Sequence, residues 1–280
     1  MKVFGISDLH LSCRKISKLR FESNEIVADW TQETENLLIS NWDSTTSDND
    51  IIFNLGDLFR RVSSVKSILK LFDDWILQRR GIHVFVKGNH DSWWTNSKIK
   101  ELRANLPSDR VTFLDDKNIF VSGNVALVGC TGYPQKESKL YRGDEQKEEE
   151  RNIIRKLKNQ MVLISNEIEN NGDLKVIVGF HFPPLCTWHK KQSKLIKVLS
   201  NSRAGKENRI LCVAYGHIHK NSKKRWINGR EMDPGPPLSH ISRGSYNRLR
   251  FICSICCGRG CPMERMVGLP AYLRRFCFGP

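Results

Sequence analysis

The sequence contains no long apolar stretch. None of its apolar runs approaches the roughly 18 residues that a membrane-spanning helix requires, so we expect no membrane span. The first run, residues 3–6, is too short for the apolar region of a secretory signal, and Asp8 follows it closely. These absences predict a cytoplasmic protein, with the nucleus as the alternative compartment.

Acidic side chains are scarce relative to basic ones. The chain carries 30 Asp and Glu against 45 Lys and Arg, which gives a formal net charge of +15. Such a surplus favours anionic partners, namely phosphate esters, nucleic acid or a membrane surface, although a solvated basic surface would produce the same count. The surplus is concentrated in residues 221–280, which hold 11 basic side chains against 3 acidic ones.

Separated pairs of cysteines, the usual mark of a structural zinc site, are also missing. Four of the nine cysteines are scattered through the body of the chain, mostly beside apolar residues, as buried thiols of a reducing compartment are: Cys13, Cys130, Cys186 and Cys212. The other five crowd the end of the chain: Cys253, Cys256, Cys257, Cys261 and Cys277. They suffice for one zinc ion, but the second separated pair that would mark such a site is absent. We therefore favour an irregular tail over a zinc site.

A cluster of helix and strand breakers divides the chain. Residues 233–237 are Asp-Pro-Gly-Pro-Pro, a composition typical of a linker. We expect one domain over residues 1–232 and an atypical basic, cysteine-rich tail over residues 233–280.

Short apolar runs alternate with amphipathic stretches along the first domain. The runs predict buried strands at residues 3–6, 51–55, 83–86, 175–178 and 210–214. Helices are predicted between them at residues 25–42, 65–78 and 145–170, and a β-hairpin is predicted at residues 119–128. Strands that alternate with helices indicate an α/β fold.

Each of the five predicted strands is followed by side chains of metal-ligand type. Ligands of α/β sheets bind beyond the carboxyl ends of the strands, so these side chains are expected to converge. All are oxygen or imidazole donors: Asp8, His10, Asp57, Asn89, His181, His217 and His219. The set suits Mn, Fe or Zn, and it suffices for two cations if one carboxylate bridges them. Asp57 is the natural bridge because it is the lone donor after its strand.

The order and spacing of these residues resemble those of the calcineurin-like metallophosphoesterases. The resemblance covers about residues 1–220 and rests on five motifs: Asp8-x-His10, Gly56-Asp57, Gly88-Asn89-His90-Asp91, His181 and Gly216-His217-x-His219. Residues 88–94 and 181–184 look like the branch of small predicted phosphohydrolases within this superfamily.

The resemblance implies a four-layer α/β/β/α sandwich of mixed sheets and a centre of two divalent metal ions, with Mn favoured and Fe or Zn as alternatives. One ion would be held by Asp8, His10, Asp57 and His219. The other would be held by Asp57, Asn89, His181 and His217. His90 would act as the catalytic acid, and Asp91 would orient it.

These implications fit the chemistry of phosphate esters. Two cations about 3.5–4 Å apart clamp the attacking and leaving oxygens of an in-line displacement, and water between them loses its proton readily. The leaving oxygen needs a proton, which His90 can deliver near neutral pH. We therefore expect a dinuclear metal-dependent hydrolase of phosphomonoesters or phosphodiesters that acts on a phosphorylated small molecule or nucleotide.

Other side chains near the motifs are candidates for substrate binding. Relatives often place an arginine near the position of Arg60 and Arg61 to bind phosphate, although a solvated helix start explains these residues as well. An aromatic rim that stacks a base would use Trp93, Trp94 and Trp188. Core packing is the commoner fate of tryptophan, and we favour it.

Two further functions stay open. A nuclease that acts on DNA or RNA is favoured by the basic charge and the aromatic residues. A non-catalytic metal-binding interaction module would keep the fold and the metals, but it would not need an acid such as His90. The sequence does not indicate the natural substrate or the oligomeric state.

Overall fold

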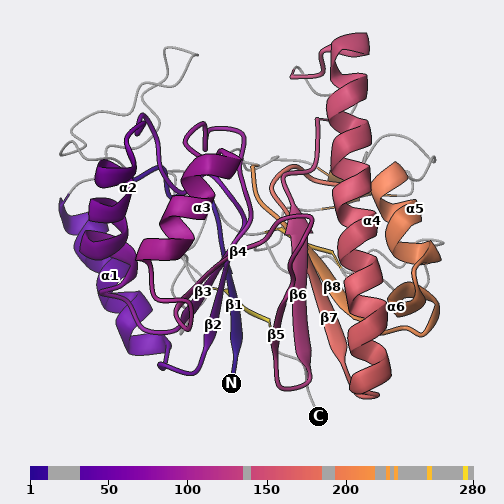
Figure 1. The fold of residues 1–280 in the computed structure, drawn as a ribbon, viewed down its shortest axis with the longest axis horizontal. Coiled ribbons are helices and arrows are strands. Elements are labelled where there is room, and N and C mark those ends of the chain that lie inside the picture. Colours follow the sequence, from indigo (N-terminus) through magenta and orange to yellow (C-terminus); the bar gives the residue numbers. More distant parts are fainter. Residues whose placement is uncertain are drawn as a thin grey trace.

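The computed structural model describes residues 1–11, 32–134, 140–184 and 193–217, together with four short strands at residues 225–227, 230–232, 251–253 and 274–276. These residues form two five-stranded sheets that face one another, with helices on both outer sides (Figure 1). The expected four-layer sandwich of mixed sheets is confirmed.

The first sheet has the strand order β12-β1-β2-β3-β4. Its bounds are β1 Val3–Ile6, β2 Ile51–Asn54, β3 Ile82–Phe85, β4 Val111–Phe113 and β12 Arg274–Phe276. Strands β1 to β4 run parallel to one another, and β12 runs antiparallel to β1. The carboxyl ends of β1, β2 and β3 therefore lie at one edge.

The second sheet has the strand order β11-β8-β7-β6-β5. Its bounds are β5 Phe120–Ser122, β6 Val125–Cys130, β7 Lys175–Phe180, β8 Ile210–Tyr215 and β11 Phe251–Cys253. The predicted hairpin is β5 and β6, and the other neighbours in this sheet are parallel. Strands β9 Arg225–Ile227 and β10 Arg230–Met232 form a separate antiparallel pair.

Helices cover the two outer faces (Figure 1). Over the first sheet lie α1 Gln32–Thr45, α2 Val65–Leu71 with a π-helical turn at Phe72–Ile76, and α3 Asn96–Asn105. Over the second sheet lie α4 Lys147–Asn170, which follows a 3-10 turn at Gly143–Gln146, and then α5 Lys194–Asn201 and α6 Arg203–Lys206. Among the described residues, no helix combines the length and the apolar character needed to cross a bilayer.

Side-chain alternation along the strands builds the layers. In β2, Ile51 and Phe53 pack in the cluster between the two sheets, whereas Ile52 packs with the helices of the first sheet. Gly179 in β7 lets the sheets approach closely, because a Cβ atom there would lie 2.3 Å from the Phe53 ring. The core is therefore three apolar layers separated by the two sheets.

Several elements differ from the sequence predictions. The helix expected at residues 25–42 continues to Thr45, and its predicted start lies outside the described residues. The helix expected at residues 65–78 changes to a π-helix at Phe72. Helices α3, α5 and α6 and strand β4 were not predicted.

The tail also differs from expectation. Its short strands β11 and β12 pair with β8 and β1, so each sheet gains an edge strand from beyond residue 250. The expectation of an irregular tail does not hold for these two segments, because their backbones pair with β8 and β1. The domain division after residue 232 stays a prediction.

Candidate metal centre

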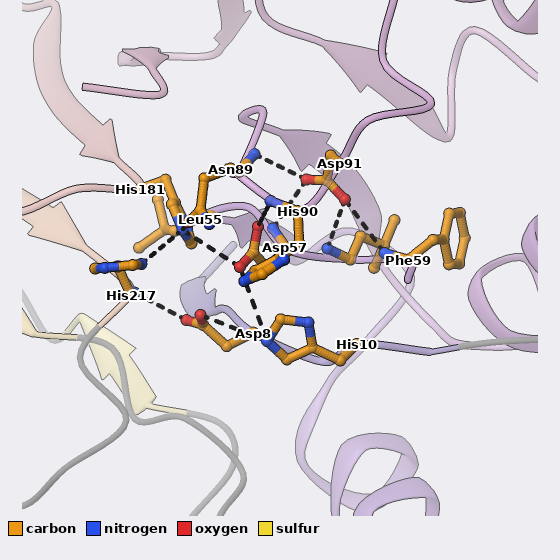
Figure 2. Close-up of polar contacts among 12 residues, drawn as sticks. Asp8, His10, Leu55, Asp57, Phe59, Asn89, His90, Asp91, His181 and His217 are labelled. Carbon is orange, nitrogen blue, oxygen red and sulfur yellow. Dashed lines mark hydrogen bonds and ion pairs between the residues drawn. The ribbon is translucent and has the colours of Figure 1, made fainter. Parts of the chain in front are cut away.

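The loops after five strands meet at one edge of the sandwich (Figure 2). Asp8 follows β1, Asp57 follows β2 and Asn89 follows β3, all from the first sheet. From the second sheet, His181 follows β7 directly and His217 follows β8. The predicted convergence therefore holds for the described donors, whereas His219 lies outside the described residues.

Four of the predicted ligands adopt left-handed backbone conformations. Their φ angles are 58° at Asp8, 47° at His10, 56° at Asp57 and 69° at His217. Residues other than glycine rarely adopt this region, and such strain concentrates at functional sites. Hydrogen bonds between loops stabilise it: Asp8 N donates to Gly56 O at 2.9 Å, and His10 N donates to Asp57 O at 2.9 Å.

Two glycines allow the loops to pack backbone against backbone. A Cβ atom at Gly88 would lie 2.1 Å from both the nitrogen and Oδ1 of Asp57. At Gly56, where φ is +94°, a Cβ atom would lie 2.6 Å from Gly88 Cα. The Gly-Asp and Gly-Asn-His-Asp motifs therefore need glycine for close approach as well as for conformation.

One donor group comprises Asp8, His10 and Asp57, whose candidate ligand atoms all lie within 4.8 Å of one another. His10 Nε2 lies 4.0 Å from Asp8 Oδ1 and 3.8 Å from Asp57 Oδ2. All three side chains are buried. The Asp8 carboxylate also accepts a hydrogen bond at 3.0 Å from the backbone N–H of His217, which joins the two sheets.

A second donor group comprises Asp57, His181 and His217. His181 Nε2 lies 3.4 Å from Asp57 Oδ2, 3.2 Å from His217 Nδ1 and 2.6 Å from Asn89 Oδ1. His181 Nδ1 lies 3.0 Å from Leu55 O. When Nδ1 donates to this carbonyl, the lone pair of Nε2 faces the other oxygen and nitrogen donors.

The electrostatics of the centre favour a bound cation. Burial, followed by the nearby carboxylates of Asp91 and Asp8, raises the pKa of Asp57 to about 9. Asp57 Oδ2 is buried and accepts no hydrogen bond from the part of the chain that the structure describes. A buried carboxylate oxygen facing other acceptors is costly unless a positive charge compensates it. The donor set therefore fits divalent metal ions, and the two groups share Asp57.

Asp91 is buried and faces the backbone of the neighbouring loop. Its Oδ2 accepts from Asp57 N at 2.9 Å and from Gly88 N at 2.8 Å. Its Oδ1 accepts from Leu58 N at 3.0 Å, Phe59 N at 3.3 Å and the Trp93 indole N–H at 3.0 Å. Burial raises the pKa of Asp91, and these backbone N–H groups oppose that rise. Asp91 thus accepts five hydrogen bonds, and the orientation of His90 that the resemblance implied stays a prediction.

Comparison with known proteins agrees with this geometry. A sequence model described as calcineurin-like phosphoesterase matches residues 1–221. The chain belongs to the calcineurin-like phosphoesterase family. Membership supports a metal-dependent phosphohydrolase in general terms.

Two individual matches accompany the family model. A crystal structure of a dimetal phosphatase from Danio rerio superposes with a TM-score of 0.52 and 12% sequence identity, covering 91% of this chain and 87% of that one. This likeness shows the fold. An uncharacterised protein of Methanocaldococcus jannaschii is 31% identical over 102 residues, which are 36% of this chain and 52% of that protein. The match thus spans about half of the relative's length.

The remaining predicted side chains of this phosphoesterase lie around the donor groups. His90 is exposed, its ring centroid lies 5.4 Å from that of His10, and its backbone N–H donates to Asp57 Oδ1 at 2.8 Å. Arg60 is half-buried, and its charge acts to lower the pKa of Asp57. Arg61 is exposed with φ 57°.

The aromatic residues divide between core and centre. Trp93 is buried against Phe59 and Phe113, and Trp94 packs on the same cluster, so the core interpretation is confirmed for both. Trp188 lies outside the described residues.

Sequence reasoning missed Phe182 as a residue of the centre. Its ring centroid lies 4.3 Å from that of His217 and 5.3 Å from that of His181. Its position directly after His181 was the available signal.

Proposed function

We propose that this phosphoesterase is a dinuclear metal-dependent hydrolase of phosphomonoesters or phosphodiesters. The observation that carries the proposal is the pair of donor groups that share the buried carboxylate of Asp57. A carboxylate shared between two imidazole-containing groups can bridge two neighbouring cations. When bound, such cations supply the positive charge that binds a phosphate ester and activates water.

The ligand sets follow the two groups. We assign Asp8, His10 and Asp57 to one cation, with His219 completing the set from outside the described residues. We assign Asp57, Asn89, His181 and His217 to the other. Oxygen and imidazole donors suit Mn best here, with Fe or Zn as alternatives.

His90 is proposed as the general acid. The side chain is exposed beside the first donor group, where a substrate can reach it. Its backbone is fixed by the hydrogen bond to Asp57 Oδ1. An imidazole can carry a proton near neutral pH and deliver it to a leaving alkoxide. Arg60 and Arg61, which follow Asp57 in the same loop, are proposed to bind phosphate oxygens.

Hydrolysis of an aryl phosphate and of its diester, with purified protein and Mn²⁺, tests the proposal. Asp57→Asn should abolish turnover and lower the metal content, because it removes the shared anionic ligand. Asp50→Asn is the matched control. Asp50 is also buried, and its carboxylate accepts hydrogen bonds from Lys2 N and Ser47 N at the opposite end of β2. The proposal is wrong if wild type with Mn²⁺, Fe²⁺ or Zn²⁺ hydrolyses neither ester.

The role of His90 needs a poor leaving group. His90→Ala should lower kcat on an alkyl phosphate while it leaves the metal content unchanged. With an aryl ester the effect should shrink, because a phenolate departs without a proton. An unchanged rate on the alkyl ester would contradict the assignment.

A nuclease activity is the second candidate, and the net charge of +15 favours it. Contacts between basic side chains and a phosphate backbone weaken steeply with salt, whereas turnover of a small ester does not. Cleavage of single-stranded DNA or RNA that falls several-fold between 50 and 200 mM salt would support this candidate. Turnover of small esters alone would exclude it.

A further inference from the structure

We infer that Asp91 is a positioning residue that holds the two ligand-bearing loops of the first sheet in register. The inference rests on the proposed function, because Asp57 is the proposed shared ligand. Asp91 belongs to the loop after β3, and three of its five donors, Asp57, Leu58 and Phe59, belong to the loop after β2. Its carboxylate thus joins the backbones of two loops 33 residues apart in sequence.

The two carboxylates exchange hydrogen bonds with each other's loops (Figure 2). Asp91 Oδ2 accepts from Asp57 N at 2.9 Å, and Asp57 Oδ1 accepts from His90 N at 2.8 Å. This reciprocal pair leaves Asp57 Oδ2 directed toward His10 and His181, at 3.8 and 3.4 Å. The His90 N–H thus holds Oδ1 of Asp57 and leaves Oδ2 to face both donor groups, while Asp91 holds the backbone of Asp57 that carries this carboxylate.

The hydrogen bonds accepted by Asp91 also hold a strained part of the backbone in place. Asp57 has φ 56°, and the strain of a non-glycine residue in this region persists only when surrounding contacts oppose its relaxation. Asp91 binds three consecutive N–H groups from Asp57 to Phe59, which fixes the turn that carries the strain. The Trp93 indole N–H, itself buried in the core, anchors Asp91 Oδ1 from the other side.

Asp91→Asn is the sharpest test because it keeps the shape of the side chain. The amide NH₂ of the asparagine must face either the two N–H groups that bind Oδ2 or the three that bind Oδ1. Because an NH₂ group cannot accept a hydrogen bond, the variant loses at least two of the five hydrogen bonds. We expect Mn²⁺ affinity to fall about 10- to 100-fold, as for other residues that orient metal ligands. We also expect the amides of residues 57–59 and 88 to exchange hydrogen faster.

Two further variants separate positioning from general loss of stability. Trp93→Phe keeps the aromatic core and removes one donor to Asp91, so it should weaken Mn²⁺ binding in the same direction by a smaller factor. Asp50→Asn also disrupts hydrogen bonds that backbone N–H groups donate to a buried carboxylate, but far from the centre. It should lower the melting temperature while Mn²⁺ affinity and amide exchange at residues 57–59 stay at wild-type values.

The outcomes distinguish this inference from the proposed function. Wild-type affinity and amide exchange in Asp91→Asn would overturn the positioning role, as would an Asp50→Asn control that loses metal equally. If wild type binds Mn²⁺ without hydrolysing any ester, the proposed function fails, while affinity and exchange still decide the role of Asp91. Should Asp91→Asn not fold, Trp93→Phe decides: unchanged Mn²⁺ affinity in that variant overturns the inference.

Discussion

His83 predicts a loss of stability in mild acid that is separate from the metal centre. This histidine of β3 is fully buried, with its ring centroid 5.7 Å from that of Trp42 and stacked on Phe85 at 6.2 Å. Burial, and after it the charge of Arg110, lowers the pKa of His83 from 6.5 to about 3, and the backbone of Arg79 opposes this only partly. The folded protein therefore keeps the imidazole neutral where the unfolded chain protonates it.

The sign and size follow from linkage. Because the folded pKa is depressed, the contribution of His83 is fully present above pH 6.5 and is lost as the pH falls toward 3. Each pH unit within that window costs about 1.4 kcal/mol. Between pH 7.5 and pH 5.0, His83 alone should lower the free energy of unfolding by about 2 kcal/mol.

Urea unfolding, followed by tryptophan fluorescence in the presence of a chelator, measures this contribution of His83 to the free energy of unfolding. His83→Phe places another ring between Trp42 and Phe85 and cannot protonate. The difference between pH 7.5 and pH 5.0 should be about 2 kcal/mol smaller in the variant than in wild type. All other titratable groups are the same in the two proteins, so their contributions cancel in the comparison. Equal losses in the two proteins would refute the reasoning.

Three further predictions concern the scaffold and the centre. Gln160→Leu removes a buried amide that hydrogen-bonds the backbone of β6 and of the loop after β4, so it should cost about 1–3 kcal/mol in chemical denaturation. The exposed Lys158→Leu on the same helix is its control, and an equal cost would contradict this explanation. Gly88→Ala should abolish metal binding in elemental analysis, because its methyl group would lie 2.1 Å from the Asp57 nitrogen, whereas Gly172→Ala projects into open space and should bind normally. Mn²⁺ at 100 times its dissociation constant should raise the unfolding free energy by about 2.7 kcal/mol. Asp57→Asn should remove that increment, and a persistent increment would locate the bound metal elsewhere.

The sequence predicted the parts of the fold that depend on short-range pattern. Apolar runs of four or five residues between polar stretches indicated β1, β2, β3, β7 and β8, and each forms within about two residues of its predicted bounds. Convergence of the donors followed from parallel strands, whose carboxyl ends share one edge. Long-range pairing carries no such signal. Strand β12 includes Arg274 and Arg275, and two adjacent charged residues do not predict a strand, although this segment pairs with β1 at the edge of the sheet.

The position of Asp91 illustrates a second limit of sequence reasoning. Adjacency in the chain suggested a partnership with His90, but neighbouring side chains in a tight turn point in different directions. The carboxylate turns inward to five N–H groups, while the imidazole beside it stays exposed. Only the fold shows that three of the five partners of Asp91 lie more than 30 residues earlier in the sequence.

The centre combines several features that each lower stability. Left-handed conformations at four non-glycine residues cost about 1–3 kcal/mol apiece, and Asp57 adds a buried carboxylate beside two others. The hydrogen bonds of Asp91 and of Gly56 O oppose this strain within the protein itself. Because these hydrogen bonds already order the loops, metal binding does not have to order them, which favours a high affinity although the site is strained. The hydrogen bonds that Asp91 forms between the β2 and β3 loops are therefore expected to contribute to metal affinity alongside the ligands themselves.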